Sequence, residues 1–600
     1  MCGIAGILTP SADGQELGRV TAMQRALRHR GPDGQGTWVS PSRQAAFAHT
    51  RLAVIDLSSA GGQPMSCQAS GLTVILNGEI YNFREVRRTL EGSGVTFRSQ
   101  SDTEVVLRAY EAYGSACVDH FRGMFAFAIW NERERTGWLA RDGFGIKPLY
   151  YLLRNGTLTF ASEVRALVAS RQVPLELDPD GTYGYFRTGS VPEPHTLLRG
   201  VRALAAGATL AWADGRVTLG RHWEIPIGRP SVPPADPVAA TRAALVDSVR
   251  HHLLADVPVG VFLSAGIDST AIVALAHALG KRDLRTFSMS FPDSVADEGP
   301  DARRSAQHYG VPHDQVAIDA SQAKAMLGGY LRSADQPSID GLNTFAVSQF
   351  AHRLGMKVVL SGIGADELFG GYASFTQVPR LHAWHRRARW AGPFAFGAGR
   401  LASTALPGVR ARRLGDLLTQ APSLPASYGT FRAIFTTAES ARLTEVYAGQ
   451  SGNGLPDVDH GAPPNLSPAD GVSRLELARY VRNQLLRDAD VMSMAWGLEL
   501  RTPFLDREVV TVLSSIPASI RLREQKRLLR EAVPELPPWV TGSQKRCFQF
   551  PFDEWLQGEW RDVFNEVERS CSVPTETWYR KWCVFALDNW MTNLKQDRDV

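Results

Sequence analysis

The sequence predicts an α+β N-terminal domain followed by an α/β C-terminal domain with a parallel sheet and a helical C-terminal part. Three observations support this prediction. The chain has 600 residues and a mass of 65.7 kDa, which is too long for one ordinary hydrophobic core. Short β-like runs dominate the first part of the chain, whereas strands alternate with helices in the second. A proline-rich stretch separates the two patterns.

Glycine, asparagine and aspartate turns separate the β-like runs of the first part. We expect strands at residues 72–76, 124–130, 138–140, 149–153 and 158–161. Helical patterns occur at about 18–30 and 101–113. This order favours antiparallel sheets covered by helices.

Residues 228–237 contain four prolines, which continue neither a helix nor a central strand. We therefore expect an N-terminal domain at 2–210, a connecting strand and linker at 211–237, and a second domain at 238–600. After the linker, strands are predicted at 258–263, 285–291, 311–318 and 357–360. Helices are predicted at 270–279, 298–309 and 343–354, and the chain from 372 onward is mostly helical. Such alternation is typical of a parallel sheet flanked by helices.

The composition argues against several classes of protein. The 65 Lys and Arg residues against 61 Asp and Glu give a net charge of +4, with only a modest arginine cluster near 386–413. No strongly basic region indicates nucleic-acid binding, and no run of 18 apolar residues indicates a membrane span. The N-terminus lacks the features of a secretory signal, and the six cysteines have no CxxC spacing. We therefore expect a globular cytoplasmic protein without a disulfide framework or a zinc site.

The N-terminus holds a candidate nucleophile. Cys2 follows the initiator methionine, whose removal would expose an α-amino group on the same residue as the thiol. An α-amine titrates near pH ~7.7–8.0, so it can act as the local base that forms the thiolate.

Six motifs follow one another in the first 151 residues. They are MCGIAGI, RHRGPDG, RLAVIDLS, NGEIYNF, SDTEV and RDGFGIKPLYY. Together they resemble the glutaminase domain of class II amidotransferases, which have an N-terminal nucleophile and layered antiparallel sheets between helices. The resemblance implies that Cys2 attacks the side-chain amide of glutamine and releases ammonia.

The same resemblance assigns the other residues of this site. Asn77 and the backbone N–H of Gly78 would form the oxyanion hole, and Arg51 would pair with the glutamine α-carboxylate. Glu79 and Asp102 would bind the α-ammonium group. Taken singly, each residue has a structural alternative. Asn77 and Gly78 form a common turn dipeptide, Arg51 could be a surface residue, and Asp102 could cap a helix.

Residues 261–270 combine a strand, a turn of small residues and the start of a helix. Backbone N–H groups at a helix start, with the hydroxyls of Ser264, Ser269 and Thr270, form a cradle for an anion. The stretch is not a Walker A motif, and a strand followed by a capped helix would fit the same residues. SAGIDST resembles the SGGxDS pyrophosphate loop of ATP pyrophosphatases, with Ala265 in place of the usual glycine.

Three further stretches extend this resemblance. The three are residues 288–291 followed by 297–298, LSGIGADELFGGY at 360–372, and the C-terminal landmarks of the synthetase domain, which comprise two segments, 487–506 and 544–556. The resemblance implies ATP as a cosubstrate and Mg²⁺ held by Asp268 and Asp366. The implied ATP-binding residues are Leu263, Ser264, Gly266, Asp268, Ser269, Ser288, Ser361 and Gly362. Lys545 is a candidate catalytic charge for the phosphates, whereas Lys526 fits a phosphate contact and a solvated surface equally well.

Over residues 1–210 and 240–560 the chain resembles the glutamine-hydrolysing asparagine synthetase B family. That resemblance implies glutamine, ATP and a carboxylic acid acceptor as substrates, with a homodimer as family precedent. The sequence departs from the family around the acceptor. Ile363 occupies the place of a glutamate thought to act as acid or base, and residues 335–344 also differ.

The acceptor-side candidates are Asp335, Asp340, Ile363 and Glu367. Aspartate and another carboxylic acid, from a polysaccharide or specialised-metabolite pathway, both stay open as the acceptor. An ATP-dependent amide-forming cyclase is a second alternative, although such relatives usually lack the glutaminase residues. An inactive scaffold is a third, which both sets of intact motifs disfavour.

Overall fold

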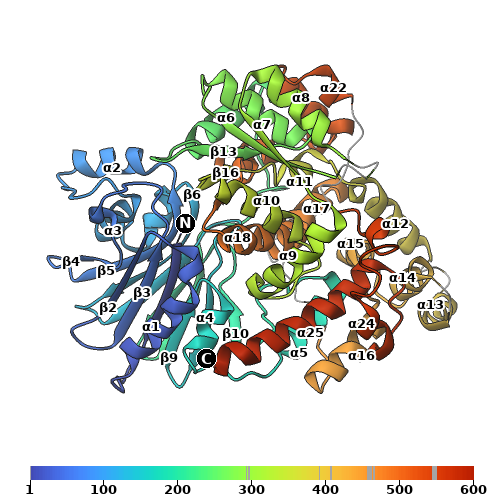
Figure 1. Cartoon of the computed structure of the whole chain (residues 1–600), viewed down its shortest axis with the longest axis horizontal. Coiled ribbons are helices and arrows are strands. Elements are labelled where there is room, and N and C mark those ends of the chain that lie inside the picture. Colours follow the sequence, from blue (N-terminus) through green and yellow to red (C-terminus); the bar gives the residue numbers. More distant parts are fainter. Residues whose placement is uncertain are drawn as a thin grey trace.

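The structure is a computed structural model that describes residues 2–599 except 292–293, 295–296, 389, 391, 406–407, 456–462, 464–465 and 543–549. The candidate residue Lys545 therefore lies outside the described residues. Figure 1 shows the N-terminal sheets on the left, the parallel sheet at the top, and a helical region on the right.

Two six-stranded antiparallel sheets form the N-terminal part. The first has the order β10-β8-β9-β1-β3-β2. Its strands are β1 (Cys2–Leu8), β2 (Gly34–Val39), β3 (Ala45–Arg51), β8 (Tyr150–Arg154), β9 (Thr157–Ala161) and β10 (Val201–Ala203). The second has the order β12-β11-β7-β6-β5-β4. Its strands are β4 (Met65–Cys67), β5 (Leu72–Ile80), β6 (Gly123–Asn131), β7 (Thr136–Arg141), β11 (Ala208–Ala213) and β12 (Arg216–Arg221).

The two sheets face each other across a buried layer of large apolar side chains. Ile4, Phe47, Ile75 and Trp130 are all fully buried in it. Helices α1 (Glu16–Ala26) and α4 (Val164–Ala169) cover the first sheet, and α2 (Phe83–Gly92) and α3 (Asp102–Tyr113) cover the second. The predicted α+β class is thereby confirmed, with layered antiparallel sheets between helices.

A five-stranded parallel sheet of order β15-β14-β13-β16-β17 forms the centre of the C-terminal part. Its strands are β13 (Val259–Phe262), β14 (Arg285–Ser290), β15 (His313–Ala317), β16 (Val358–Leu360) and β17 (Glu499–Arg501). The helices around it are α6 (Pro237–His252), α7 (Ile267–Ala278), α8 (Gly299–Tyr309), α9 (Ala320–Ser333), α10 (Leu342–Arg353) and α18 (Arg487–Met494). Alternate strand residues pack toward α7 and toward α10 and α18, because successive side chains point to opposite faces. The predicted strand–helix alternation is confirmed, and β17 is a strand that the sequence did not indicate.

The remainder of the C-terminal part is helical, as predicted. Its first helices are α11 (Ala365–Phe369), α12 (Ser374–Ala388), α13 (Pro393–Ala405), α14 (Val409–Leu418), α15 (Leu424–Arg432), α16 (Thr437–Ala448) and α17 (Pro468–Leu475), with a π-helical segment at Glu476–Leu486. Then come α19 (Arg507–Ser515), α20 (Ala518–Arg521), α21 (Arg527–Ala532), α22 (Pro538–Thr541), α23 (Phe552–Trp555), α24 (Asn565–Ser570) and α25 (Trp578–Asp599). The long helix α25 returns to the N-terminal sheets and contacts α4 and α9 (Figure 1).

Between β12 and α6, residues 222–236 form neither helix nor strand, as the proline content predicts. The two parts also meet through buried charges. Arg30 is fully buried and pairs with Glu163 at 2.7 Å and with Asp490 of α18 at 2.8 Å. Because breaking such a buried pair leaves an uncompensated charge, this contact holds the two parts in register.

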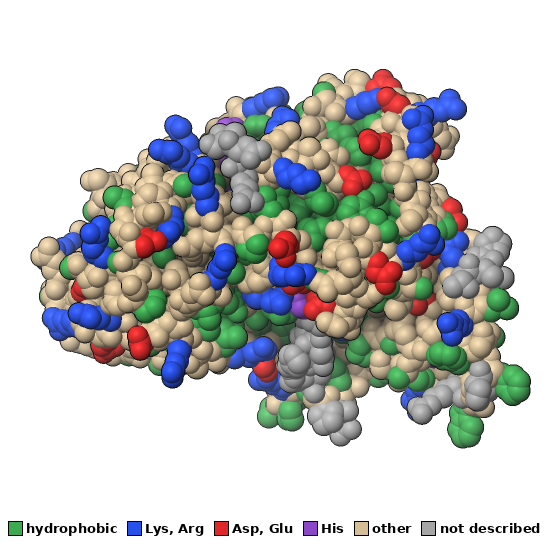
Figure 2. Space-filling model, turned by 90° about the horizontal axis from the view of Figure 1, so that it is seen from below, with side chains coloured by type: hydrophobic (Ala, Val, Ile, Leu, Met, Phe, Trp, Pro, Cys, Tyr) green, Lys and Arg blue, Asp and Glu red, His purple; other side chains and the backbone are tan. Residues whose placement is uncertain are grey.

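Charged side chains are dispersed over the surface. In Figure 2, Lys and Arg side chains lie among Asp and Glu side chains over the whole face and do not merge into one basic area. Among the described residues, no helix combines the length and the apolar character that crossing a membrane requires.

Candidate active sites

Cys2 begins strand β1 and is buried beside β3 and β5. Its register partner in β3 is Arg51, and its backbone N–H donates to Asn77 Oδ1 at 3.1 Å. Burial raises the pKa of the Cys2 thiol. Asn77 lies within β5, so the alternative interpretation of Asn77 and Gly78 as a turn is wrong.

Gly78 follows Asn77 in the strand with a φ of 144°, a conformation that favours glycine. A Cβ atom there would lie only 2.0 Å from the carbonyl oxygen of Met124 on the neighbouring strand. Glycine is therefore required for β5 to place its backbone next to Cys2.

Three further side chains of the predicted glutaminase site lie close to these strands. The Arg51 guanidinium donates to the carbonyl oxygens of Asp56 and Ser58, which fix its orientation. Burial, then the neighbouring Asp102 carboxylate, raises the pKa of Glu79. Burial likewise raises the pKa of Asp102 to about 6. Ser101 caps helix α3, so the alternative of Asp102 as that cap is also wrong.

The arrangement suits a ligand that carries an ammonium group. Glu79 Oε2 is buried and has no hydrogen-bond partner among the described residues, and Asp102 accepts a hydrogen bond from Ile80 N at 3.0 Å. Two adjacent buried carboxyls repel each other when both are ionised, and a cation between them removes that repulsion.

Strand β17 contributes charges to this site that sequence reasoning missed. Glu499 and Arg501 are buried and pair at 2.6 Å, and the Arg501 guanidinium lies 5.5 Å from the ring of Tyr81. Burial is the main cause that raises the pKa of Cys2 and of Asp102, and the charge of Glu499 raises both further. Strand β17 also connects to the second part of the chain, because the carbonyl of Arg501 accepts a hydrogen bond from Ser361 N at 2.8 Å. Only the motif around these residues could have pointed to them.

A second candidate site is a cavity of about 960 Å³ at the carboxyl ends of β13 and β16. This volume is at the upper end of the ~300–1,000 Å³ of ligand pockets. Ligands of open α/β sheets bind at this edge, where loops leave the strands. Of the predicted ATP-binding residues, those that line the cavity are Leu263, Ser264, Gly266, Asp268, Ser269, Ser361 and Gly362.

Hydrogen bonds between its own residues stabilise the predicted pyrophosphate loop. Ser264 N donates to Ser269 Oγ at 3.0 Å, and Gly266 N donates to Ser264 Oγ at 3.2 Å. Gly266 directly precedes α7, so the loop presents the first turn of that helix to the cavity. Ser288 does not line the cavity, and its hydroxyl lies 3.1 Å from His313 Nε2.

Lys526 lies between the two predicted metal ligands. Its Nζ is 2.6 Å from both carboxylate oxygens of Asp268 and 2.5 Å from Asp366 Oδ1. Although burial opposes it, the two carboxylates raise the pKa of Lys526 to about 12. The surface-lysine alternative is wrong, since this residue is buried. Two carboxylates that converge on one cation fit Mg²⁺, which prefers oxygen ligands.

The acceptor-side candidates separate into two groups. Asp340, Ile363 and Glu367 line the cavity, and burial followed by Asp366 raises the pKa of Glu367 to about 8. Asp335 does not line it: its carboxylate accepts hydrogen bonds from Val164 N at 2.8 Å and from Arg165 N. Asp335 therefore caps a helix of the N-terminal part and lies between the two parts of the chain.

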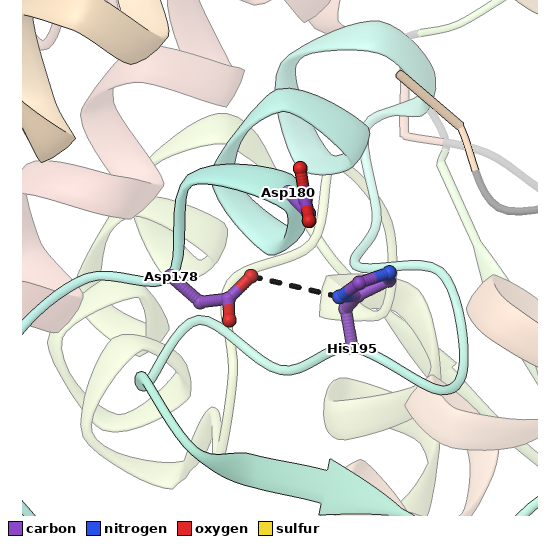
Figure 3. Close-up of side chains that lie close together, drawn as sticks. All are labelled: Asp178, Asp180 and His195. Carbon is purple, nitrogen blue, oxygen red and sulfur yellow. Dashed lines mark ion pairs between the residues drawn. The ribbon is translucent and has the colours of Figure 1, made fainter. Parts of the chain in front are cut away.

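Asp178, Asp180 and His195 lie close enough together to be tested as a metal site (Figure 3). The Arg202 guanidinium, however, is 2.7 Å from His195 Nδ1 and 3.3 Å from Asp178. A cation already within this group makes it an ion-pair network of the domain, and we assign no ligand to it.

Comparison with known proteins finds two family models that match successive parts of the chain. Residues 1–223 match a family model described as a glutamine amidotransferase domain, and residues 240–587 match one described as asparagine synthase. An asparagine synthetase [glutamine-hydrolyzing] 1 of Bacillus subtilis is 33% identical over 95% of this chain and 90% of its own. A putative asparagine synthetase of Mycobacterium bovis is 35% identical over 93% of this chain and 88% of its own. The fungal amidase chry2 of Gibberella zeae is 26% identical over 96% of this chain and 92% of its own.

Fold and matches together define a glutamine-hydrolysing amidotransferase with a second, ATP-using domain. The chain belongs to the asparagine synthase family.

Proposed function

We propose that the protein transfers ammonia from glutamine to a carboxylic acid that it activates with ATP. Residues 2–210 would hydrolyse glutamine, residues 238–600 would activate the acid, and 211–237 would connect the two. The observation that supports the proposal is that candidate groups of each site, apart from Lys545, lie close together in the fold. Cys2 adjoins Asn77 in one, and the cradle at Ser264 faces Asp268, Asp366 and Lys526 in the other.

In the first site, the Cys2 thiolate would attack the glutamine side-chain amide, with the α-amine of the mature N-terminus taking the thiol proton. Asn77 and the Gly78 N–H would stabilise the oxyanion. Breakage of the C–N bond releases NH₃ and leaves a γ-glutamyl thioester, which water hydrolyses to glutamate. Arg51, Glu79 and Asp102 would hold the two charged ends of the substrate.

In the second site, the acceptor carboxylate would attack the α-phosphate of ATP, giving an acyl-adenylate and pyrophosphate. Ammonia then attacks the acyl carbon, and AMP leaves as the amide forms. Lys526 and the loop from Ser264 to Ser269 would hold the phosphates. Mg²⁺ at Asp268 and Asp366 would neutralise developing negative charge when bound.

An apolar region lies between the two sites. Leu52, Met124 and Ile146 of the N-terminal part belong to one continuous hydrophobic cluster with Leu263 and Leu360. This composition supports transfer of uncharged NH₃ between the sites, since bulk water would protonate it to NH₄⁺.

The default acceptor is aspartate, which gives asparagine, and another carboxylic acid is the second candidate. Ile363 favours the second candidate because it lines the cavity and cannot exchange a proton with ammonia. Glu367, with its raised pKa, is the residue that we propose for that exchange.

The proposal is tested with the purified protein, glutamine, MgATP and aspartate, by following asparagine, AMP, pyrophosphate and glutamate by mass spectrometry. Asparagine and AMP in equal amounts identify asparagine synthesis. Glutamate without asparagine supports the chemistry at Cys2 and turns the search to other acids. If the protein forms no glutamate and no pyrophosphate with any acid tried, that result contradicts the proposal and favours a scaffold.

The assignment of Ile363 has its own test. Ile363→Glu should change acceptor turnover and leave glutaminase activity intact, because the residue lines only the second cavity. An equal fall in both activities would show that Ile363 does not act at the acceptor.

A further inference from the structure

The second cavity extends beyond the residues proposed to bind ATP and to activate the acceptor acid. Besides Glu367, its lining includes one wall formed by residues of α14, α15, the loop after α15, the π-helical segment and the start of α25. The side chains that matter most on this wall are Arg413, Phe431, Ile434, Tyr480, Trp578 and Tyr579. Five of the six are aromatic or apolar, whereas one is a cation.

A series of contacts leads from the activating end to this wall. Burial raises the pKa of Tyr372 most, and the charge of the Glu367 carboxylate raises it next. The two side chains are therefore neighbours. The Arg432 guanidinium lies 5.1 Å from the Tyr372 ring and 3.8 Å from the Tyr480 ring. Two residues further along, the carbonyl of Ile434 lies 3.5 Å from an Arg413 nitrogen. Arg413 is therefore separated from Glu367 by a layer of aromatic rings.

Arg413 differs from the arginines around it in having no carboxylate partner among the described residues. Arg412 pairs with Glu439 at 3.1 Å and with Glu576 at 2.7 Å, and Arg580 pairs with Glu439 at 2.7 Å. Arg432 is likewise neutralised, because it lies 2.7 Å from a buried carboxylate at Glu476.

The contacts of Arg413 leave its charge uncompensated. Within the part of the chain that the structure describes, it reaches the hydroxyl of Tyr579, at 3.2 Å, and the Ile434 carbonyl, and its buried Nε meets no hydrogen-bond partner there. Burial, followed by the nearby cation of Arg580, lowers its pKa. The residue is half-buried, so its guanidinium has lost part of its hydration without gaining an anion, and an anion that binds it recovers that cost. Its planar group suits a carboxylate or a phosphate in particular.

We propose that the acceptor is an elongated acid with an aromatic or aliphatic body and a second anionic group, which Arg413 binds. This inference rests on the proposed function, in which the acid reacts beside the ATP-binding loop and Glu367 exchanges a proton with ammonia. An acid held there must cross the aromatic layer to reach Arg413. The rings of Phe431 and Trp578 would then contact its body, which gains affinity from the apolar surface that is buried.

The proposal is tested by calorimetric titration of the full-length protein in the presence of Mg²⁺ and a non-hydrolysable ATP analogue. Matched probes are suberate against octanoate, and 4-(4-carboxyphenyl)butanoate against 4-phenylbutanoate, with L-aspartate as reference. A phosphonate analogue of the aromatic diacid distinguishes the type of anion. We expect each diacid to bind at least 10-fold more tightly than its monoacid and than aspartate.

The variant Arg413→Gln should remove the difference between diacid and monoacid, and Arg410→Gln, an exposed arginine of the same helix, should keep it. Equal affinities for both members of each pair, tightest binding of aspartate, or an unchanged preference in Arg413→Gln would overturn the inference. Glutamate and pyrophosphate release are measured in parallel. Their absence counts against the proposed function. Equal affinities for diacid and monoacid in the unchanged protein, with both activities present, count only against the role of Arg413.

Discussion

Replacement of Lys526 by methionine tests the charge arrangement of the second site. The change keeps the length of the side chain and removes a cation that lies within 2.6 Å of both Asp268 and Asp366. Leaving one partner of a buried pair uncompensated costs about 3–5 kcal/mol of stability. Losing a preorganised charge that faces the reacting phosphates lowers the rate by roughly 10²–10³.

We therefore expect Lys526→Met to release pyrophosphate about 10²–10³ times more slowly and to unfold at a lower temperature, with glutaminase activity kept. Because two carboxylates remain without their cation, added Mg²⁺ should raise the melting temperature of this variant more than that of the unchanged protein. The control is Arg527→Met, which removes the exposed cation of the next residue along the chain. Pyrophosphate release at the normal rate, or an equal loss of glutaminase activity, would refute the reasoning.

Three further predictions concern the first site and the contact between the domains. The KM for glutamine should rise as the pH falls below about 6, since protonation of Asp102 removes the charge that attracts the ammonium; a flat KM profile would contradict this. Gly78→Ala should abolish glutaminase activity, because the added methyl group would meet the carbonyl oxygen of Met124; normal turnover of glutamine would show that the strand can adjust. Arg30→Met should destabilise the protein by about 3–5 kcal/mol, because Asp490 loses one of its cations; calorimetry that finds no change would argue against the buried pair.

The local sequence was sufficient for most of the fold. Alternation of apolar runs with turns predicts β5 to β9, and the strand–helix order predicts β13 to β16, because both patterns depend on neighbouring residues. Strands β1 to β4, β10 and β17 escaped prediction, and strand length alone does not explain this, because β1 and β3 span Cys2–Leu8 and Ala45–Arg51 whereas the predicted β16 spans only Val358–Leu360. The motifs around Cys2 and Ser264 indicated the two sites because each motif is a short continuous segment that can be read from neighbouring residues.

Only the tertiary structure decided how distant segments meet. In the sequence, Lys526 fits a surface position and is 258 residues away from Asp268. The fold nevertheless brings the two side chains into contact. Asp335 belongs to a segment that the motif places at the acceptor, but its carboxylate binds the backbone of α4. Arg413 lies next to Arg412 in the sequence, yet only Arg412 meets carboxylates among the described residues, at Glu439 and Glu576. Charges act over a few ångströms of space, whatever their separation in sequence, so the sequence named the chemistry and the packing determined which charges face each other.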